Sequence, residues 1–251
     1  MTGKIAASGN INTLLKADGS VLDLTGRDWC YCYMFQGCTA LTQAPELPAT
    51  TLAYCCYYWM FNNCTSLKQA PKLPAMILAD ICYESMFSAC TSLTQAPKLP
   101  ATTLTERCYT SMFSGCRNLI QAPELPATTL AYCCYRWMFE DCLSLTQPPA
   151  LPATTLAFDC YYGMFYNCQS LTQAPELPAT ILCSDCYSGM FYNCSKLNSI
   201  NINFSNWNVY SEPTSNWVTG VASSGTFTCP TALPENRGTS NIPEGWTVVR
   251  K

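Results

Sequence analysis

The hydrophobic positions of the chain follow one pattern that returns every 26 residues. Met-Phe occurs at 34–35, 60–61, 86–87, 112–113, 138–139, 164–165 and 190–191, and a Cys-Tyr pair, a second Cys and a Leu keep the same step. The unit reads approximately C-Y-x-x-M-F-x-x-C-x-x-L-x-Q-A-P-x-L-P-A-T-T-L-A-x-x. Seven copies without an insertion predict a stacked solenoid, in which each unit buries its apolar face against its neighbours.

Two elements are predicted in each unit. Residues 53–64 contain no Gly or Pro, and at about 100° per residue their unvarying positions fall within an arc of about 140°. These positions are Cys56, Tyr57, Met60, Phe61 and Cys64. The varying positions fall on the opposite side, so the segment is predicted to be a short amphipathic helix. Residues 67–74 are punctuated by prolines and are predicted to be extended, with few ladder hydrogen bonds.

The fold class predicted from these elements is a curved α/β solenoid of seven 26-residue units. Extended segments stack about 4.8 Å apart, whereas packed helices need about 8–10 Å. The extended segments should therefore line the concave side and the short helices the convex side. Residues 1–26 and 203–251 lack the repeat, so the first segment is predicted to be an N-terminal cap and the second a C-terminal cap or small module, flanking the repeats at 27–202.

Composition excludes several classes of function. The chain has 251 residues, 12% of them charged, and a net charge of −3, which argues against binding nucleic acid. No apolar run approaches the roughly 18 residues of a membrane span, so membrane insertion is not expected. Residues 1–20 lack the apolar segment of a signal peptide. The chain has no histidine, the commonest general base and metal ligand, and we predict no catalytic residue, metal or cofactor.

Nineteen cysteines allow three interpretations: a disulfide framework, metal clusters, or a ladder of buried reduced thiols. We favour the ladder. Thiols eight residues apart on a helix are about 12 Å apart, and helices of neighbouring units lie beyond the roughly 7 Å limit for a disulfide. Zinc needs four ligands that converge on one point, which a regular ladder does not supply. Cys183 and Cys186 form a C-x-x-C, but no second pair stands at zinc spacing.

The varying columns of the predicted helix carry large aromatic side chains, which are typical of protein or sugar recognition surfaces. They have two interpretations: packing between neighbouring helices, or a ligand-binding face. The candidate ligand-binding residues are Tyr54, Tyr58, Trp59, Tyr132, Arg136, Trp137, Tyr162, Tyr166 and Tyr192. The alternative surface is the concave side, where Thr42, Gln43 and Glu46 begin polar columns.

The segment Phe61-Asn62-Asn63-Cys64-Thr65-Ser66-Leu67, followed by Leu73-Pro74, resembles the BspA-like leucine-rich repeat, whose pattern is F-x-x-C-x-x-L-x-x-I-x-(I/L)-P. The resemblance covers about residues 27–202. The unit here is a few residues longer, and Ala-Pro replaces the Ile at the strand centre, so a regular, fully paired sheet is not expected. Near the C-terminus, Asn216-Trp217-Val218, Gly225-Thr226-Phe227 and residues 242–248 resemble the closing segment of surface-protein and phage tail-protein repeats of gut Bacteroidales.

This resemblance implies adhesion or recognition at a bacterial cell surface without catalysis, with a protein or glycan as the ligand. The alternative is a structural or receptor-binding component of a phage tail fibre. The corresponding locations are extracellular, at the cell surface or in a virion. An enzyme is disfavoured because the repeats offer no unique polar cluster. The sequence specifies neither the ligand nor the oligomeric state.

Overall fold

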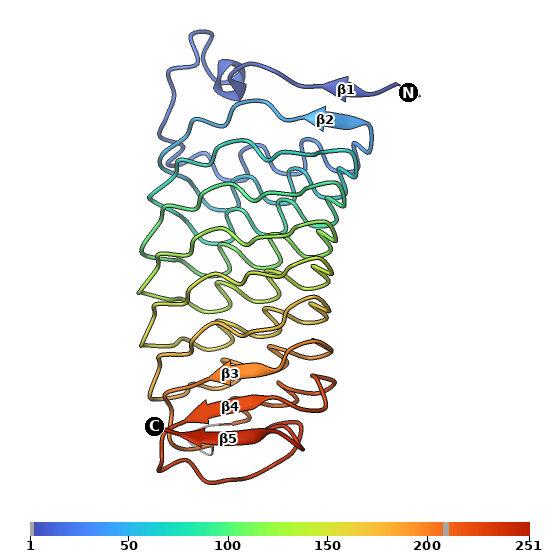
Figure 1. Ribbon diagram of the computed structural model, residues 1–251. Helices are drawn as coiled ribbons and strands as arrows, with labels where there is room; N and C mark the ends of the chain where they lie inside the picture. Colours follow the sequence, from blue (N-terminus) through green and yellow to red (C-terminus); the bar gives the residue numbers. More distant parts are fainter. Residues whose placement is uncertain (1–2, 208–210) are drawn as a thin grey trace.

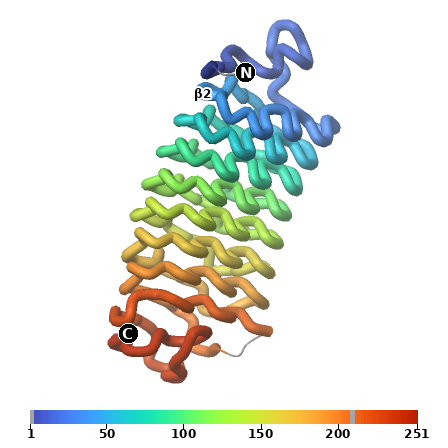
Figure 2. The backbone as a smooth tube through the Cα atoms, turned by 90° about the vertical axis from the view of Figure 1, so that its right-hand side faces the viewer, coloured from blue at the N-terminus to red at the C-terminus, as the bar shows by residue number. Residues whose placement is uncertain are grey.

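A computed structural model describes residues 3–207 and 211–251. The chain winds into a stack of similar coils, with its two termini at opposite ends of the stack (Figure 1). The coils follow one another in chain order, and the axis of the stack is nearly straight (Figure 2). Because each coil contacts mainly its two neighbours, the protein is a solenoid, as the 26-residue step predicts.

Regular strands occur only towards the two ends of the described chain. Strand β1 pairs in parallel with β2, and β3, β4 and β5 form a parallel three-stranded sheet. The elements are β1 (Ile5–Ala6), the 3-10 helix η1 (Ile11–Leu14), β2 (Leu41–Gln43), β3 (Ser199–Asn201), β4 (Thr226–Cys229) and β5 (Thr247–Arg250). Between them, the proline-rich segments make isolated parallel bridges, such as Gln69 with Gln95. A proline two residues beyond each glutamine has no N–H to donate, so the bridges do not extend into a sheet.

The helix predicted over residues 53–64 is wrong, because this segment is a ribbon of consecutive turns. Alternate amides donate to the carbonyl three residues earlier, as Met60 N does to Tyr57 O at 3.2 Å. The amides between them mostly donate to the next coil, as Phe61 N does to Met86 O at 2.9 Å. About half of the backbone hydrogen bonds of the ribbon therefore join neighbouring coils, whereas a helix would keep them within one segment.

Left-handed backbone conformations make this ribbon possible. Cys55, Trp59 and Asn63 have φ angles of 56°, 54° and 58°. A type II turn needs a positive φ at its third residue, which is where these residues stand. The Asn63 column fits this requirement best, because Gly, Asn and Asp reach positive φ most readily. Its members are Gly37, Asn63, Ala89, Gly115, Asp141, Asn167 and Asn193.

The predicted division into a strand-lined concave side and a helical convex side is also wrong. Helices would separate the coils by about 8–10 Å on one side. Instead, the phenylalanine rings of the turn ribbon follow one another at 5.4–5.8 Å between centroids, and the adjacent tyrosine rings from Tyr57 to Tyr187 at 5.6–5.9 Å. This spacing is only about 1 Å larger than that of paired strands, so the stack has little reason to bend.

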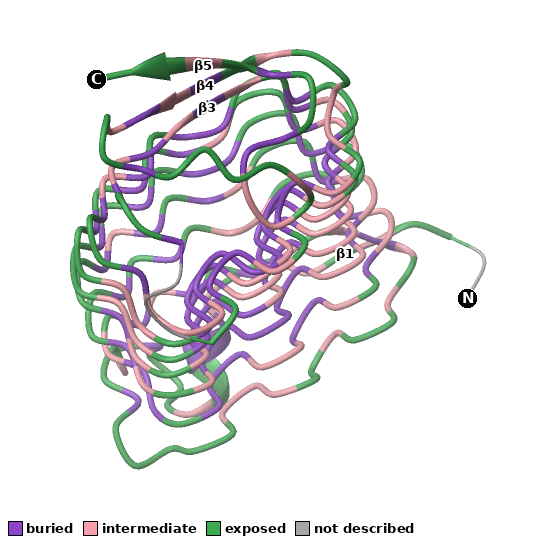
Figure 3. Ribbon diagram, turned by 90° about the horizontal axis from the view of Figure 1, so that it is seen from below, coloured by how far each residue is buried: buried purple, intermediate pink, exposed green. Residues whose placement is uncertain are grey.

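The core lies between the turn ribbon and the proline-rich segment of each coil. Figure 3 looks along the stack and shows the buried positions of successive coils lying over one another. The Tyr, Met, Phe, Cys and Leu columns that the repeat holds constant are buried from the second coil onward. The second cysteine of each unit also satisfies a carbonyl, since Cys116 Sγ lies 3.1 Å from Phe87 O and the same contact recurs along the column.

We expect the buried column thiols to resist alkylation in the native protein. All nineteen cysteines are free thiols, and burial raises the pKa of Cys116 and of Cys194 to about 12, so both remain protonated near pH 8. Iodoacetamide should modify the half-buried Cys30, Cys38 and Cys183 first, with Cys30 favoured because a hydrogen bond from Cys56 lowers its pKa, and the buried column thiols only after denaturation. Intact mass before and after denaturation, without reductant, measures this. Recovery of eight or nine disulfides would contradict it.

The segments outside the repeat are hydrogen-bonded onto the stack. At the N-terminal end, Ile11 N donates to Glu46 O at 3.1 Å. Beyond the seventh unit the inter-coil hydrogen bonds continue with a shift of one residue. Tyr187 N donates to Pro213 O at 2.9 Å and Phe191 N to Trp217 O at 2.8 Å, both 26 positions ahead, whereas Phe165 N donates to Met190 O, 25 positions ahead. Trp217 thus takes the position that methionine holds in the repeats, because its carbonyl accepts from Phe191 N as that of Met190 accepts from Phe165 N, and it is fully buried.

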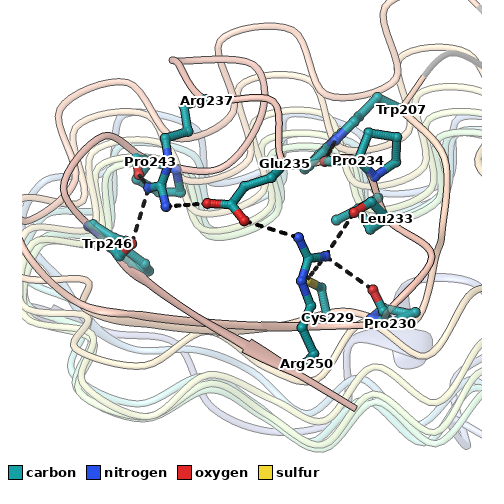
Figure 4. A network of polar contacts seen from close by, with 10 residues as sticks. All are labelled: Trp207, Cys229, Pro230, Leu233, Pro234, Glu235, Arg237, Pro243, Trp246 and Arg250. Atoms are coloured by element: carbon teal, nitrogen blue, oxygen red, sulfur yellow. Dashed lines mark hydrogen bonds and ion pairs between the residues drawn. The ribbon is translucent and has the colours of Figure 1, made fainter.

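Two arginines satisfy the last carbonyls of the C-terminal end (Figure 4). The Arg250 guanidinium donates to Leu233 O at 2.8 Å and to Pro230 O at 3.3 Å. Arg237 donates to Trp246 O at 3.1 Å. The Glu235 carboxylate bridges the two guanidinium groups, with contacts of 2.8 and 3.3 Å. Charge-assisted hydrogen bonds therefore occupy carbonyls at this end of the stack.

Candidate functional site

The outer side of the turn ribbon carries all nine residues that the sequence predicts as ligand-binding. Side chains alternate in pairs along the ribbon, so positions 56–57 and 60–61 point into the core while 58–59 and 62–63 face outward. Tyr54 and Tyr132 are 39% and 42% exposed, and the other seven are half-buried. The structure groups them into two aromatic clusters, one on the first two coils and one on the fifth to seventh.

The first cluster contains Tyr54, Tyr58 and Trp59, together with two residues that the sequence does not single out, Trp29 and Tyr33. Tyr33 meets Tyr58 edge to face at 5.3 Å between centroids, and Trp29 meets Tyr54 at 5.6 Å. Trp29 is 53% exposed and Tyr33 46%. Both stand in the same outward columns of the first unit, so their register with Cys55 and Trp59 could have identified them.

The third and fourth coils separate the two clusters with small residues and one ion pair. Arg107 binds Glu84 through two hydrogen bonds, of 2.8 and 3.0 Å. Glu84 is only 5% exposed, and burial raises its pKa despite the opposing effect of the Arg107 hydrogen bonds. The aromatic face is therefore interrupted by a polar, mostly neutralised stretch.

The second cluster surrounds Arg136. Its guanidinium carbon lies 4.3 Å from the ring centroid of Trp137 and 4.5 Å from that of Tyr162, which are distances of cation–π contacts. Arg136 Nη1 also contacts Asp159 Oδ2 at 2.7 Å. The guanidinium is thus held both by aromatic rings and by a carboxylate. Tyr132 lies beside this group and stacks on Phe158 at 5.5 Å.

A hollow of about 480 Å³ opens next to Arg136, between the fifth coil and the segment that follows the seventh. The stacked rings of Tyr166 and Tyr192, 4.7 Å apart and nearly parallel, form part of its wall. The rest of the lining includes the rings of Trp137 and Tyr162 and the carboxylates of Glu140, Asp185 and Glu212.

Two neighbouring glycines in one column differ in what fills the space beside them, and only Gly189 lines the hollow. A Cβ atom on Gly163 would lie 2.3 Å from the Trp137 ring, so the indole occupies that space. A Cβ atom on Gly189 would have no closer neighbour than the Gly163 Cα, at 4.0 Å. The same column carries Trp59 and Trp137 in other coils. The hollow therefore lies where a tryptophan at position 189 would place its indole.

The described residues that line the hollow include three carboxylates and no basic side chain. Burial raises the pKa of Glu140, although a hydrogen bond from Ser114 Oγ at 2.9 Å partly offsets this. Burial also raises the pKa of Asp185, and the neighbouring Asp159 and Glu212 add to the effect. Among residues 3–207 and 211–251, no group of three Cys, Asp or Glu side chains is placed to hold a metal ion. The hollow offers rings and carboxylates for binding.

Together, the stacked coils and the partly exposed aromatic face define a repeat protein with an aromatic outer face. Comparison with known families shows which class of repeat this is. The family described as BspA type Leucine rich repeat region (6 copies) matches residues 31–146 and 85–212. The chain belongs to this family, which confirms the resemblance of its repeats. No curated protein matches, and no solved structure does.

Membership in the family indicates a general kind of function and no particular ligand. BspA-type repeats are generally surface-associated modules for binding or adhesion, and they are typically not catalytic. Leucine-rich repeats generally bind other proteins. In the part of the chain that the structure describes, no helix has the length and apolarity to cross a membrane.

Proposed function

We propose that this protein is a non-enzymatic recognition or adhesion module that binds a protein or glycan ligand at a bacterial surface. The proposal rests on the partial exposure of the aromatic face, whose rings contact one another but are not fully covered. Exposed aromatic surface is unfavourable by about 25 cal/mol per Å², so a partner that covers it gains that free energy. The nine candidate residues would supply the contacts, with Arg136 adding a cation.

The alternative, a component of a phage tail fibre, rests on the C-terminal sequence resemblance. Both alternatives are binding functions and would use the same face. The genes that flank this one distinguish them, because tail and lysis genes favour the phage component and surface-export genes favour the adhesin.

We further propose that residues 1–26 and 203–251 act as caps of the repeat stack. The support is that β1 covers β2 at one end and that the network of Arg237, Glu235 and Arg250 satisfies carbonyls at the other. Solenoids need such terminal segments to keep apolar surface away from water.

We expect Trp59→Ala and Trp137→Ala to weaken ligand binding by at least about tenfold, since large buried aromatic contacts dominate most interfaces. A glycan and protein array probed with the purified chain would identify ligands, and titration of the variants would measure the loss. The matched control is Ile120→Ala, which removes a side chain that is 54% exposed on the proline-rich side.

Unchanged affinity in both tryptophan variants would contradict the proposed face. The columns that begin with Thr42, Gln43 and Glu46 would then become the better candidate surface. Thermal unfolding of each variant shows whether a loss of affinity reflects a lost contact or a lost fold.

A further inference from the structure

One recurring contact between neighbouring coils on the outer face joins a residue to the residue 23 positions later. Two such contacts are ion pairs with opposite polarity. Glu84 accepts from Arg107, at 2.8 and 3.0 Å, and Arg136 donates to Asp159 at 2.7 Å. The geometry of the ribbon thus places a carboxylate of one coil within reach of a guanidinium of the adjacent coil.

At the next such contact the cation is missing. Asp185 stands 23 positions after Tyr162, and no basic side chain among the described residues forms an ion pair with it. Asp185 is half-buried, and it lines the hollow together with Glu140 and Glu212. Burial and the neighbouring carboxylates disfavour the charge of Asp185, and Arg136 opposes this only in part, so a cation that entered the hollow would stabilise the carboxylate further.

The shape of the hollow suits a flat cation. The Tyr166 and Tyr192 rings are stacked within 1° of parallel, and the Tyr162 ring adds a further aromatic surface. One coil earlier, the chain places its own guanidinium against the Tyr162 and Trp137 rings while a carboxylate holds it in register. The hollow offers the same two components, rings and carboxylates, around open space.

We infer that this hollow receives a basic side chain, an arginine in preference to a lysine, from a protein partner. The inference rests on the proposed binding function of the aromatic face and specifies part of its ligand. A guanidinium can stack on the rings and donate paired hydrogen bonds to a carboxylate, whereas an ammonium is a compact, strongly hydrated charge. An exposed arginine on the partner would enter beside Arg136, with Asp185 and Glu212 as its acceptors.

The test is a nuclear magnetic resonance titration of the full chain with the peptide Ac-Gly-Arg-Gly-NH2. We expect saturable shifts of the Gly189 and Tyr192 amides, weaker binding of the lysine counterpart, and no binding of the uncharged citrulline counterpart. Absence of binding by the arginine peptide overturns the inference. Equal binding of the citrulline peptide also overturns it, because the charge would then contribute nothing.

Three variants locate the site. Asp185→Asn and Glu212→Gln keep the side-chain size and should each raise the Kd of the arginine peptide at least about fivefold. Gly189→Tyr fills the hollow without changing charge, and Tyr33 shows that this column accommodates a tyrosine at a φ of 56°, close to the 62° of Gly189. The matched control, Glu124→Gln, removes one exposed carboxylate on the proline-rich side and should leave the Kd within about twofold.

The outcomes separate this inference from the broader proposal. If the arginine peptide binds but the three variants bind it as well as the Glu124→Gln control does, the hollow is not the site. If array ligands depend on Trp59 and Trp137 while no arginine peptide binds, the aromatic face functions and only the arginine assignment fails. If neither is observed, both fail.

Discussion

Phe61→Ala is expected to lower the free energy of unfolding by about 3–5 kcal/mol, the usual cost of removing a fully buried aromatic ring. The ring is 0% exposed and lies between those of Phe35 and Phe87, at 5.4 and 5.6 Å. Truncation would leave a cavity in the middle of a ladder whose backbone is hydrogen-bonded on both sides, so the neighbours cannot collapse to fill it. Urea denaturation followed by circular dichroism measures the loss.

The same substitution one coil earlier provides the matched control. Phe35 is only half-buried and stacks on a single phenylalanine, Phe61. Phe35→Ala should therefore cost about half as much or less, since both the buried area and the cavity are smaller. Equal costs at the two positions would mean that the ladder is not a stack of pairwise contacts.

The spacing of the conserved columns specifies the solenoid, its 26-residue register and its buried positions, all from sequence. It does not specify a helix. Inward positions at 56–57, 60–61 and 64 repeat every four residues, which lies close enough to 3.6 that a helical wheel accommodates them. The evidence against a helix was in the Asn63 column, where six of seven residues are Gly, Asn or Asp, the residue types that adopt positive φ most readily.

The sequence predicts one part of the candidate site, the aromatic columns, and misses another, the carboxylates of the hollow. The outward aromatic columns are visible in the sequence because they vary while the core columns do not. The carboxylates of the hollow were not predicted, because contacts between residues 23 positions apart depend on how far each coil is offset from the next. That offset becomes known only from the inter-coil hydrogen bonds. Once it is known, Glu84 with Arg107 and Arg136 with Asp159 become recognisable as ion pairs.

Arg107→Ala is expected to lower the free energy of unfolding by about 2–3 kcal/mol at pH 7, far more than loss of an ordinary surface ion pair. The reason is that the two side chains of the pair are buried to very different extents. The Arg107 side chain is 42% exposed, whereas that of Glu84 is 6% exposed and would be left as a buried charge without its two hydrogen bonds. The double variant Glu84→Gln/Arg107→Ala should recover part of the loss, because the buried group is then neutral.

The pH dependence of Arg107→Ala gives a second and independent readout. Burial already raises the pKa of Glu84 in the native protein, and removal of Arg107 takes away the hydrogen bonds that oppose this effect. A carboxyl whose pKa is higher in the folded than in the unfolded state binds its proton more tightly when folded, so stability falls as the pH rises through the folded pKa. The deficit of Arg107→Ala relative to the wild type should therefore shrink as the pH is lowered from 7 towards 5. Glu84→Gln/Arg107→Ala should lack this dependence, and a deficit of Arg107→Ala that stays constant with pH would show that Glu84 is not the group left unpaired.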